Sequence, residues 1–575
     1  MASDPAQATG DFLPSEDREP VNAVGAAKVI QSPPPEQPKS IWTRRYIIFS
    51  FWAIVVCFGL PLWIRTTTVY RADLPLRVMQ QWADGLTCQF EVPLHVVVEA
   101  PGVSPTVAER LAQTLEEYYN EQNLFPIHGL RVTLSDPPQY DDGSQTPGSD
   151  RTGLAGASSN TVLTVRLKPS ESESTALSRL DPYEAVLDVY YSPQHLETTR
   201  TTEPHTRWPF ADVIVGEIQK VFAEEQAALA HLFINSGSPV KIDHLDELLY
   251  PQRKEKLARR ATRSFKYAPV YHLTFSLFTP AATPSAWEIK AALDEYLEPL
   301  LRSFTTISNF TIDTQIQLFA SFSPSIHGPL YDAESHLWTL QKTDLSGFIN
   351  AAEWPLSPSI GEGPTINFIL YVPGERATPL VIAETGGTSW LIPQWGGVQI
   401  LNLERESGDR SMLTEADLKQ VVFTFADQLT SLLGLPTSPA SHALRISSLT
   451  RSHTISLILS ASSTLGSLAR LTQKLPQISI PDTVAKSVDM TIHHLESACN
   501  SLKAGEFSRA LEHARTAEAE AEKAFFEPSM VGQVYFPDEH KVAVYLPLLG
   551  PVAVPLIMAV IKEVRAWRAA RRKGG

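Results

Sequence analysis

The residues that could do nucleophilic, metal or phosphate chemistry do not fall into a recognised spacing. The nearest approach to the nucleophile motif G-x-S-x-G is Gly387–Leu391, which ends in leucine where the motif requires glycine. The chain also has no H-E-x-x-H, C-x-x-C or G-K-[ST] pattern. Cys88 and Cys499 could each act as a nucleophile with a distant histidine, but no neighbouring residue indicates it. We therefore predict no catalytic residue, metal ligand or cofactor site.

Two adjacent polar pairs also fail as ligand sets. His493 and His494 lie in a helical segment, where adjacent positions point about 100° apart and so do not make a two-histidine metal face. Asp141 and Asp142 lie in a Gly-, Ser- and Pro-rich stretch at 136–160 that has no calcium-loop spacing. Solvated side chains are the interpretation we prefer for the two histidines.

Composition indicates a globular protein and argues against some partners. The chain has 575 residues, 43% of them hydrophobic, and a net charge of −15 without a basic tract that could neutralise nucleic acid. Its three cysteines cannot form a disulfide framework. Cys88 and Cys499 could pair if they face an oxidising compartment, or they could be buried free thiols.

An uncharged run, Tyr46–Ile64, lies near the N-terminus. As a helix, it would extend about 30 Å, the thickness of the hydrocarbon core of a bilayer. Trp42 and Trp63 lie at its two ends, where aromatic rings favour the headgroup level. The run is too long for a signal-peptide core, and Arg65 follows it where a small-residue cleavage site would be needed. We predict a first transmembrane helix at 42–64; a buried helix of a soluble protein is the alternative.

A second uncharged run at 542–561 predicts another transmembrane helix. It contains residues that kink or weaken helices, and a membrane helix tolerates these where neighbours satisfy the freed carbonyls. We therefore expect this helix to pack against other membrane helices, with pore lining as the alternative. The candidate packing residues are Pro547, Gly550, Pro551 and Pro555.

The flanking charges predict the topology. Lys39, Arg44 and Arg45 precede the first run, and a basic tail at 562–575 follows the second. The positive-inside rule then places both ends in the cytosol, including a polar, proline-rich, disordered tail at 1–41. The region between the helices would be lumenal. Asn309-Phe310-Thr311 is a glycosylation sequon that agrees with this, although single sequons also arise by chance.

Between the two membrane helices, strand and helix patterns interleave. Segment 65–480 predicts an α/β region with mixed sheets and helices on their faces, long enough to hold two subdomains. Segment 481–530 predicts a helical hairpin with its turn at Gly505. The clearest helix is Thr414–Leu433, which has one continuous apolar stripe. Two other helices are predicted to begin at capping pairs, Thr106 with Glu109 and Ser285 with Glu288.

Several motifs resemble one family. They are Gly59–Pro75 after the first apolar run, Asn309–Asp313, Trp395–Val398, Phe525–Pro528, Tyr535–Pro537, and Ala543–Pro547 with Pro551–Pro555 in the second run. Together they resemble the PIG-S family, whose members are subunits of the glycosylphosphatidylinositol (GPI) transamidase. The resemblance covers about 42–562, with one membrane helix near each end and a large lumenal region between them.

The resemblance implies a role and a set of partners. GPI transamidase is a complex of the endoplasmic reticulum membrane that attaches a preassembled GPI anchor to the C-terminus of a precursor protein. In the family, PIG-K carries the catalytic residues, and PIG-T, PIG-U and a Gaa-type subunit complete the complex. This chain would be a non-catalytic structural or substrate-presenting subunit. Trp395, Gly396 and Gly397 would be candidate lumenal interface residues.

Two other functions stay open on the sequence. One is a lumenal, membrane-anchored transferase acting on glycolipids, which would need a concave polar pocket with titratable groups of shifted pKa. The other is a lumenal adaptor or chaperone unrelated to GPI anchors.

Overall fold

The fold is taken from a computed structural model of the chain. It describes residues 37–67, 70–135, 160–170, 177–192, 208–237, 248–320, 328–341, 343, 345, 363–403, 411–475, 478–532 and 538–573. The chain divides into two compact units. The first comprises Met1–Thr68 and Phe536–Gly575, and the second is Val69–Tyr535.

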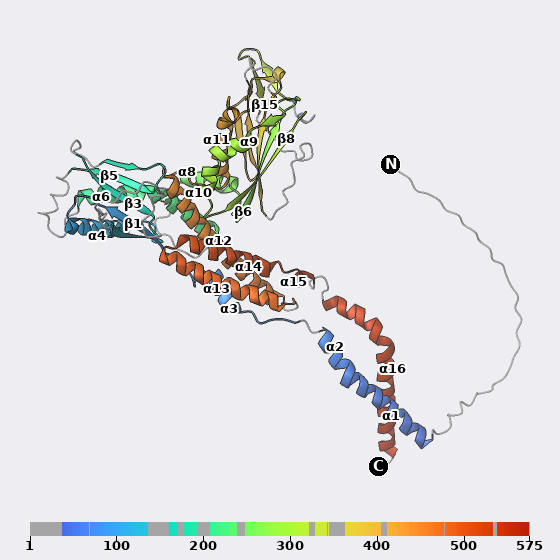
Figure 1. The fold of residues 1–575 in the computed structure, drawn as a ribbon. Helices are drawn as coiled ribbons and strands as arrows, with labels where there is room; N and C mark the ends of the chain where they lie inside the picture. The colour runs from blue at the N-terminus through green and yellow to red at the C-terminus, as the bar shows by residue number, and fades with distance from the viewer. Residues whose placement is uncertain are drawn as a thin grey trace, which may run out of the picture. The chain divides into compact units, whose positions relative to one another are not determined.

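The first unit consists of helices from the two ends of the chain (Figure 1). Helix α1 (Pro38–Ile54), the π-helical turn η1 (Val55–Gly59) and α2 (Leu60–Thr67) follow one another, and α16 (Asp538–Lys573) comes from the C-terminal end. In the part of the chain that the structure describes, Lys39–Leu62 is the one helical stretch long and apolar enough to cross a membrane. None of its apolar part is buried within the protein.

The π-helical turn has a local cause. Pro61 lacks the N–H that would donate to the carbonyl one α-turn earlier, and Gly59 restrains the backbone little. The backbone N–H of Leu60 donates instead to the oxygen of Val55, five residues back. The uncharged run therefore remains one continuous helical segment despite its proline.

In the second unit, the first sheet has the strand order β2-β1-β3-β5-β4. Three of its pairings are parallel, and the edge strand β4 pairs antiparallel with β5. The strands are β1 (Val92–Glu99), β2 (His128–Leu134), β3 (Leu163–Pro169), β4 (Leu177–Leu180) and β5 (Val186–Tyr191). From Leu94 to Glu99, alternate residues of β1 are buried, as in a strand with one face against the core.

Helices around this sheet share its hydrophobic core (Figure 1). They include α3 (Leu76–Ala83), α4 (Pro105–Gln122), α6 (Pro209–Asn235) and α8 (Pro251–Arg263). The predicted cap of α4 is wrong. The helix begins one residue before Thr106, with Ser104 at the N-cap, because Pro105 has the backbone φ of a first helical residue and no N–H to satisfy.

The second sheet has the order β13-β14-β11-β6-β8, again parallel except for one edge pairing, β13 with β14. Its strands are β6 (Val270–Phe278), β8 (Asn309–Gln317), β11 (Thr365–Tyr371), β13 (Ser389–Ile392) and β14 (Gly396–Ile400). Two cores lie against it. One includes α9 (Ile289–Tyr296) and α11 (Glu415–Leu432), and the other includes part of a smaller sheet.

That smaller sheet has the order β12-β10-β9, from β9 (Leu330–Asp332), β10 (Leu337–Leu340) and β12 (Leu380–Ile382), and the short helix η4 (Glu375–Ala377) precedes β12. The cap predicted at Ser285 is also wrong. Strand β7 (Ala286–Trp287) pairs there with β15 (Met412–Leu413), so α9 starts at Ile289 and is followed by α10 (Glu298–Ser303). Pairing with a strand distant in sequence has overridden a local helix signal.

The predicted helix at Thr414–Leu433 is confirmed as α11. Its N-cap is Thr414, whose hydroxyl accepts from the backbone N–H of Asp417 while the Asp417 carboxylate accepts from the Thr414 N–H. Gly434 follows the helix with φ +76°, a conformation that glycine adopts without strain. The interleaving of strands and helices through the second unit is likewise as predicted.

A set of long helices ends the second unit: α12 (His442–Lys474), α13 (Asp482–Ala504) and α14 (Phe507–Phe525), followed by the short α15 (Pro528–Gly532). Helices α13 and α14 pack along each other through fully buried alanines of α14, where small side chains allow close approach. Helix α12 was not predicted. Its many Ser and Thr residues have modest helix propensity and obscure the apolar stripe.

A buried ion pair fastens α12 inside the unit. Arg451 of α12 donates from Nε and Nη2 to the two carboxylate oxygens of Glu225 on α6, both at 2.6 Å. The two side chains are 0% and 3% exposed. The Arg451 guanidinium also lies 5.1 Å from the ring centroid of Phe507 on α14. One residue of α12 therefore contacts two other helices.

Burial and the charge of Arg451 determine the protonation states of Glu225 and of the nearby His128. Burial raises the pKa of Glu225, but the charge and hydrogen bonds of Arg451 outweigh it and hold that pKa below its ordinary value. The imidazole of His128, at the start of β2, lies 3.6 Å from the same carboxylate. Burial lowers the pKa of His128 to about 4, so this ring is neutral at pH 7. The group is thus a single ion pair beside a neutral histidine.

Breaking this pair should destabilise the second unit strongly. We expect Glu225→Gln or Arg451→Met to lower the free energy of unfolding by about 3–5 kcal/mol, because each leaves the other charge buried and unpaired. The double variant Glu225→Leu/Arg451→Leu should recover most of that loss. The measurement is thermal unfolding of the purified full chain, followed by tryptophan fluorescence. Single variants that melt like the wild type would contradict this account.

Candidate interaction sites

The structure resolves the alternative that the sequence left open for Cys88 and Cys499. Cys88, which precedes β1, and Cys499 of α13 form a disulfide. Each is only 6% exposed. Neither can supply the free thiolate that a nucleophile requires. Cys57, in the π-helical turn, is free and exposed.

The remaining candidate chemical groups that the structure describes do not assemble into a site. Among the described residues, no three His, Cys, Asp or Glu side chains are grouped so as to hold a metal ion. The Nδ1 atoms of His494 and His513 lie 3.0 Å apart across α13 and α14. Burial, followed by the neighbouring imidazoles, lowers the pKa of His494, which favours the neutral form of that side chain. Ser389 is exposed at the start of β13, and Asp141 and Asp142 lie outside the described residues.

Gly396 and Gly397 have internal packing roles. A Cβ on Gly396 would lie 1.8 Å from the backbone oxygen of Asn367 on β11. A Cβ on Gly397 would lie 1.9 Å from Oε1 of Gln428 on α11. The Gln428 amide donates to the backbone oxygen of Trp390, 3.1 Å away. Both glycines are buried, so neither offers a side chain or an open surface to a partner.

Trp395 is the member of this turn that a partner could reach. It is half-buried and packs at the margin of the core shared by the second sheet and the β12-β10-β9 sheet. The preceding residue, Gln394, has φ +54°, and its amide donates to the backbone oxygen of Thr262 at 3.2 Å. The turn is therefore fastened to the end of α8. That Trp395 contacts another subunit stays a prediction.

The sequon lies at the start of an edge strand. Asn309 is the first residue of β8, and its side chain is exposed. Its backbone N–H donates to the oxygen of Pro269 at 2.9 Å, which leaves the side-chain amide outside the strand pairing. Thr311 is also exposed, and its hydroxyl contacts Nδ1 of His272 on β6. The geometry is compatible with a glycan at Asn309.

The prolines of α16 lie along one side of the helix. Pro547, Pro551 and Pro555 are spaced by four residues and are exposed. On a regular helix, their side lies about 170° from the residues of α16 that face α1. Each proline also lacks an N–H, so the carbonyl four residues earlier has no helical donor. Gly550, by contrast, has open space where a Cβ would be.

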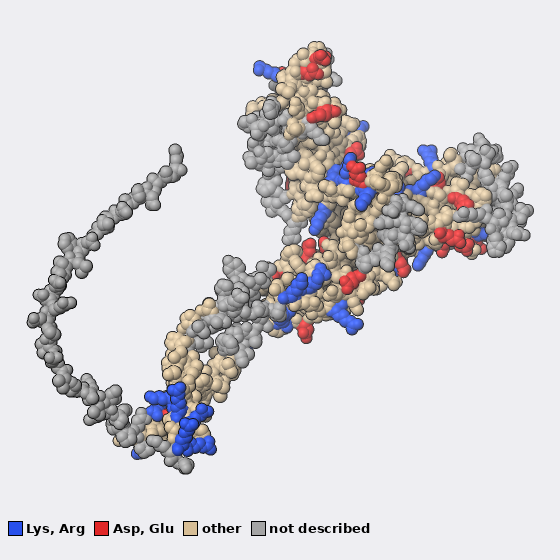
Figure 2. Space-filling model, turned by 180° about the vertical axis from the view of Figure 1, so that it is seen from behind, with Lys and Arg blue, Asp and Glu red and all other residues tan. Residues whose placement is uncertain are grey.

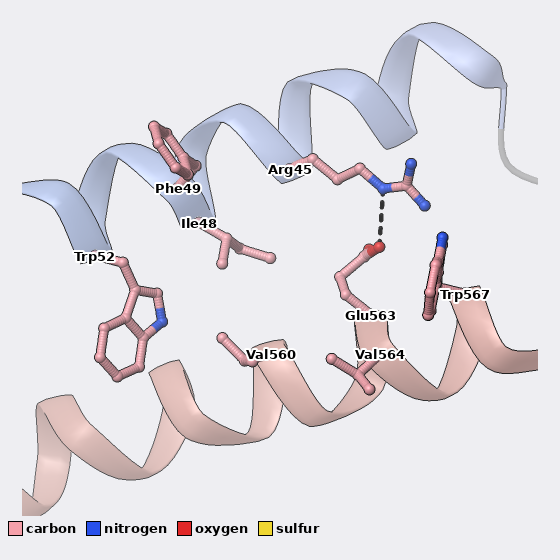
Figure 3. Close-up of a pocket in the computed structure, with 8 residues that line it drawn as sticks. All are labelled: Arg45, Ile48, Phe49, Trp52, Val560, Glu563, Val564 and Trp567. Atoms are coloured by element: carbon pink, nitrogen blue, oxygen red, sulfur yellow. Dashed lines mark hydrogen bonds and ion pairs between the residues drawn. The ribbon is translucent and has the colours of Figure 1, made fainter.

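Helices α1 and α16 meet at their charged ends and run in opposite directions (Figure 3). The Glu563 carboxylate accepts from Arg44 at 2.7 Å and from Arg45 at 2.9 Å. Figure 2 shows Lys and Arg gathered at this end of the unit, with an uncharged stretch beside them. The sequence signal for this contact is a lone glutamate in a basic tail.

A cavity of about 370 Å³ lies next to these ion pairs. Its polar lining comes from Arg45 and Glu563, and its aromatic lining from Phe49, Trp52 and Trp567. Ile48, Val560 and Val564 complete it (Figure 3). The arrangement is an apolar recess between two helices with charges at one end.

Comparison with known protein families accounts for this architecture. The family model for the phosphatidylinositol-glycan biosynthesis class S protein, PIG-S, matches residues 50–570. The chain belongs to the PIG-S family. The match runs from the first apolar helix into the basic end of α16, so it includes both units.

Curated members of the family align along nearly their whole length. The human protein named GPI-anchor transamidase component PIGS is 26% identical over 92% of this chain and 96% of its own. The GPI transamidase component PIG-S homolog of Schizosaccharomyces pombe is 26% identical over 91% of this chain and 84% of its own. The GPI transamidase component GPI17 of Saccharomyces cerevisiae is 25% identical over 92% of this chain and 94% of its own.

The disulfide yields a prediction on thiol labelling. In the denatured, unreduced full chain, we expect a maleimide to label Cys57 alone, whereas after reduction it should label all three cysteines. Cys88→Ser should expose the thiol of Cys499 to labelling and destabilise the second unit by about 2–5 kcal/mol. Peptide mass spectrometry before and after reduction provides the measurement. Labelling of Cys88 or Cys499 in the unreduced wild type would contradict the pairing.

The sequon yields a second prediction, with a matched pair of variants. If the second unit is lumenal, glycosidase treatment should increase the gel mobility of the wild type, and Asn309→Gln should already have that mobility. Thr311→Ala should behave like Asn309→Gln, whereas Thr311→Ser keeps the sequon and should behave like the wild type. Equal mobility of all four proteins before and after treatment would contradict glycosylation of Asn309.

Proposed function

We propose that this chain is a membrane-anchored subunit of a GPI transamidase complex in the endoplasmic reticulum. The observation that carries the proposal is the alignment over nine-tenths of the chain with proteins named as components of this enzyme in a mammal and in two yeasts. Such a complex attaches preassembled GPI anchors to the C-termini of precursor proteins. Our proposal assigns this chain a structural or substrate-presenting role in that reaction.

The proposed topology has two membrane helices, the Tyr46–Ile64 run and the 542–561 segment of α16, with both termini cytosolic. The second unit, Val69–Tyr535, which is also the large unit, would be lumenal together with its α13–α14 helix pair. The Cys88–Cys499 disulfide supports this placement, because disulfides persist in oxidising compartments and are rare in the cytosol. Two further observations support the same topology. Asn309 is exposed in its sequon, and basic residues flank both apolar runs.

The chemistry of the described residues favours a non-catalytic role. Both cysteines of the large unit are bonded to each other. The strongly shifted pKa values belong to buried packing groups such as His128 and Tyr119, not to an open polar cleft. The catalytic residues would then reside in another subunit, which the family resemblance assigns to PIG-K, with PIG-T, PIG-U and a Gaa-type protein as further partners.

The proline side of α16 is the surface we assign to partner membrane helices. Its exposed prolines leave backbone carbonyls without helical donors, and inside a bilayer water cannot satisfy them. Donors on a neighbouring helix can. This side points away from α1, so a partner could occupy it without displacing that contact.

Affinity purification tests the proposal. The full chain, tagged and extracted in a mild detergent, should recover relatives of PIG-K and PIG-T, identified by mass spectrometry. Recovery of the chain without them would contradict the proposal and favour a separate lumenal enzyme or adaptor. In cells that lack the endogenous subunit, expression of this chain should restore surface display of a GPI-anchored reporter.

Straightening α16 should weaken the complex. We expect Pro551→Ala/Pro555→Ala to restore the helical hydrogen bonds and reduce recovery of partner subunits by at least about tenfold, about 1.4 kcal/mol. Pro61→Ala, in the other membrane helix, is the matched control and should leave recovery unchanged. Melting of the large unit should be the same in all three proteins. Undiminished recovery with the double variant would contradict the assignment of this side.

A further inference from the structure

The helix set α12–α14 has one end at the point where the chain enters the second unit. These helices lie side by side (Figure 1). Tyr70 is the first described residue of the unit. Its backbone oxygen accepts from the N–H of Ile480 at 3.1 Å, and its hydroxyl donates to the carboxylate of Asp482 at 2.7 Å. Since Asp482 is the first residue of α13, the entering chain is fastened to the start of that helix.

The chain also leaves the unit at this end. Helices α13 and α14 are joined by a tight turn and pack along each other, so they are antiparallel. The Nδ1 atoms of His494 and His513 face each other across the pair at 3.0 Å. Positions equally far from this contact lie at the same level, which sets the start of α13 at Asp482 beside the end of α14 at Phe525. We call this place, with Tyr70, Leu475, Asp482 and Phe526, the tether end.

The link from the tether end to the first apolar run is short. Helix α2 continues to Thr67, so the residues from Ile64 to Thr67 add about 5 Å along a helix axis. The three positions from Thr67 to Tyr70 cover at most about 11 Å even in a fully extended chain. The backbone of Tyr70 therefore lies within about 15 Å of the end of the first apolar run.

Three large side chains of the tether end are exposed. Tyr70, Leu475 and Phe526 are 61%, 40% and 68% exposed. Leu475 follows α12, and its backbone oxygen accepts from the N–H of Ile478 in a turn. The next residue, Ser479, donates from its hydroxyl to the backbone oxygen of Tyr70 at 3.3 Å. This turn therefore joins the end of α12 to the entering chain.

We propose that the tether end rests on the bilayer surface, with the side chains of Tyr70, Leu475 and Phe526 in the headgroup layer. Aromatic rings with one polar edge favour that layer, and the hydroxyl of Tyr70 keeps its bond to Asp482 there. The inference rests on the two membrane helices proposed above. It requires neither the transamidase assignment nor a particular side of the membrane.

The short link favours the bilayer over a partner subunit as the occupant. A link of this length makes contact with the bilayer an intramolecular event, so three modest apolar contacts can hold it. Lipid charge is not needed. The charged residues close to the exposed side chains have both signs, with Arg71 and Lys474 on one side of the balance and Asp73 and Asp482 on the other. The surface should therefore bind a neutral phospholipid bilayer.

The test measures how close these positions lie to lipid headgroups. The full chain carries Cys57→Ala, which leaves only the bonded pair Cys88 and Cys499. It is purified with whatever subunits accompany it and placed in phosphatidylcholine vesicles. Leu475→Cys or Phe526→Cys then adds one thiol, which is labelled with a nitrobenzoxadiazole fluorophore. Phosphatidylcholine with a nitroxide on its headgroup, present in both leaflets, quenches a label that lies in that layer.

Tyr183→Cys is the matched control. Tyr183 is 79% exposed, and its backbone oxygen accepts from the N–H of Ala443 at the start of α12. The 33 residues of α12 separate it from Leu475 by about 50 Å. The nitroxide should quench the labels at 475 and 526 at least about threefold more than the label at 183, because the headgroup layer is only about 6 Å deep.

Substitutions at the tether end should change this quenching. With the label at 475, Phe526→Glu should reduce quenching at least about twofold, because a carboxylate resists removal from water. Phe526→Leu keeps an apolar side chain and should retain the quenching, as should Tyr183→Glu at the far end of α12. Replacing about one fifth of the lipid by phosphatidylserine should leave the quenching unchanged, since the nearby charges have both signs.

Two outcomes would overturn the inference. One is equal quenching of the labels at 475, 526 and 183. The other is a crosslink from a photoreactive residue at position 526 to another subunit, without quenching at 475, which would show that a protein covers the tether end. The experiment reads only the distance to lipid, so loss of transamidase partners would not mimic the first outcome. Glycosylation of Asn309 reports the side of the membrane independently.

Discussion

The Arg451–Glu225 ion pair is the constraint on which the large unit depends. Two ions taken out of water are stabilised only if their geometry is close to ideal, and here both carboxylate oxygens accept from one guanidinium at 2.6 Å. Such a pair forms only when α6 and α12 are fully docked. It therefore fixes the position of α12 along its own axis. Without it, the 33 residues of this helix could make many alternative apolar contacts.

The position of α12 along its axis matters because its side chains pack in two different hydrophobic cores. Leu449 packs in the core shared by the second sheet, α9 and α11, whereas Ile455 and Leu465 pack in the core of the first sheet. Arg451 lies between these positions. Helix α14 makes a second connection, since Arg515 donates to the backbone oxygen of Ile307 just before β8. The two five-stranded sheets are thus joined through helices that neither sheet could position alone.

The disulfide adds a covalent link to the same arrangement. Cys88 and Cys499 are separated by 411 positions, so their bond links the segment before β1 to α13 irrespective of the intervening fold. An isolated parallel bridge between Arg71 and Ile480 makes another link between the beginning and the end of this unit. Such a link restricts how far the two segments can move apart, which is the rigidity that the proposed structural role would require.

Sequence patterns determined the features that depend only on residues close together in the chain. The uncharged runs and the apolar stripe of α11 each follow from the residue pattern of one element, and hydrophobic burial acts on that pattern directly. The mixed α/β class and the family resemblance could also be predicted from the residues. The sequon was visible as well, because it is a local motif.

Only the tertiary structure decided which distant residues meet. It paired Ala286–Trp287 with Met412–Leu413, which abolished the cap predicted at Ser285. It chose the disulfide over free thiols, used Gly396 and Gly397 for internal packing, and set Glu563 between two arginines of the opposite terminus. Each outcome depends on contacts between segments far apart in the chain. Local periodicity has no information about such contacts, because they form only once the layers are assembled.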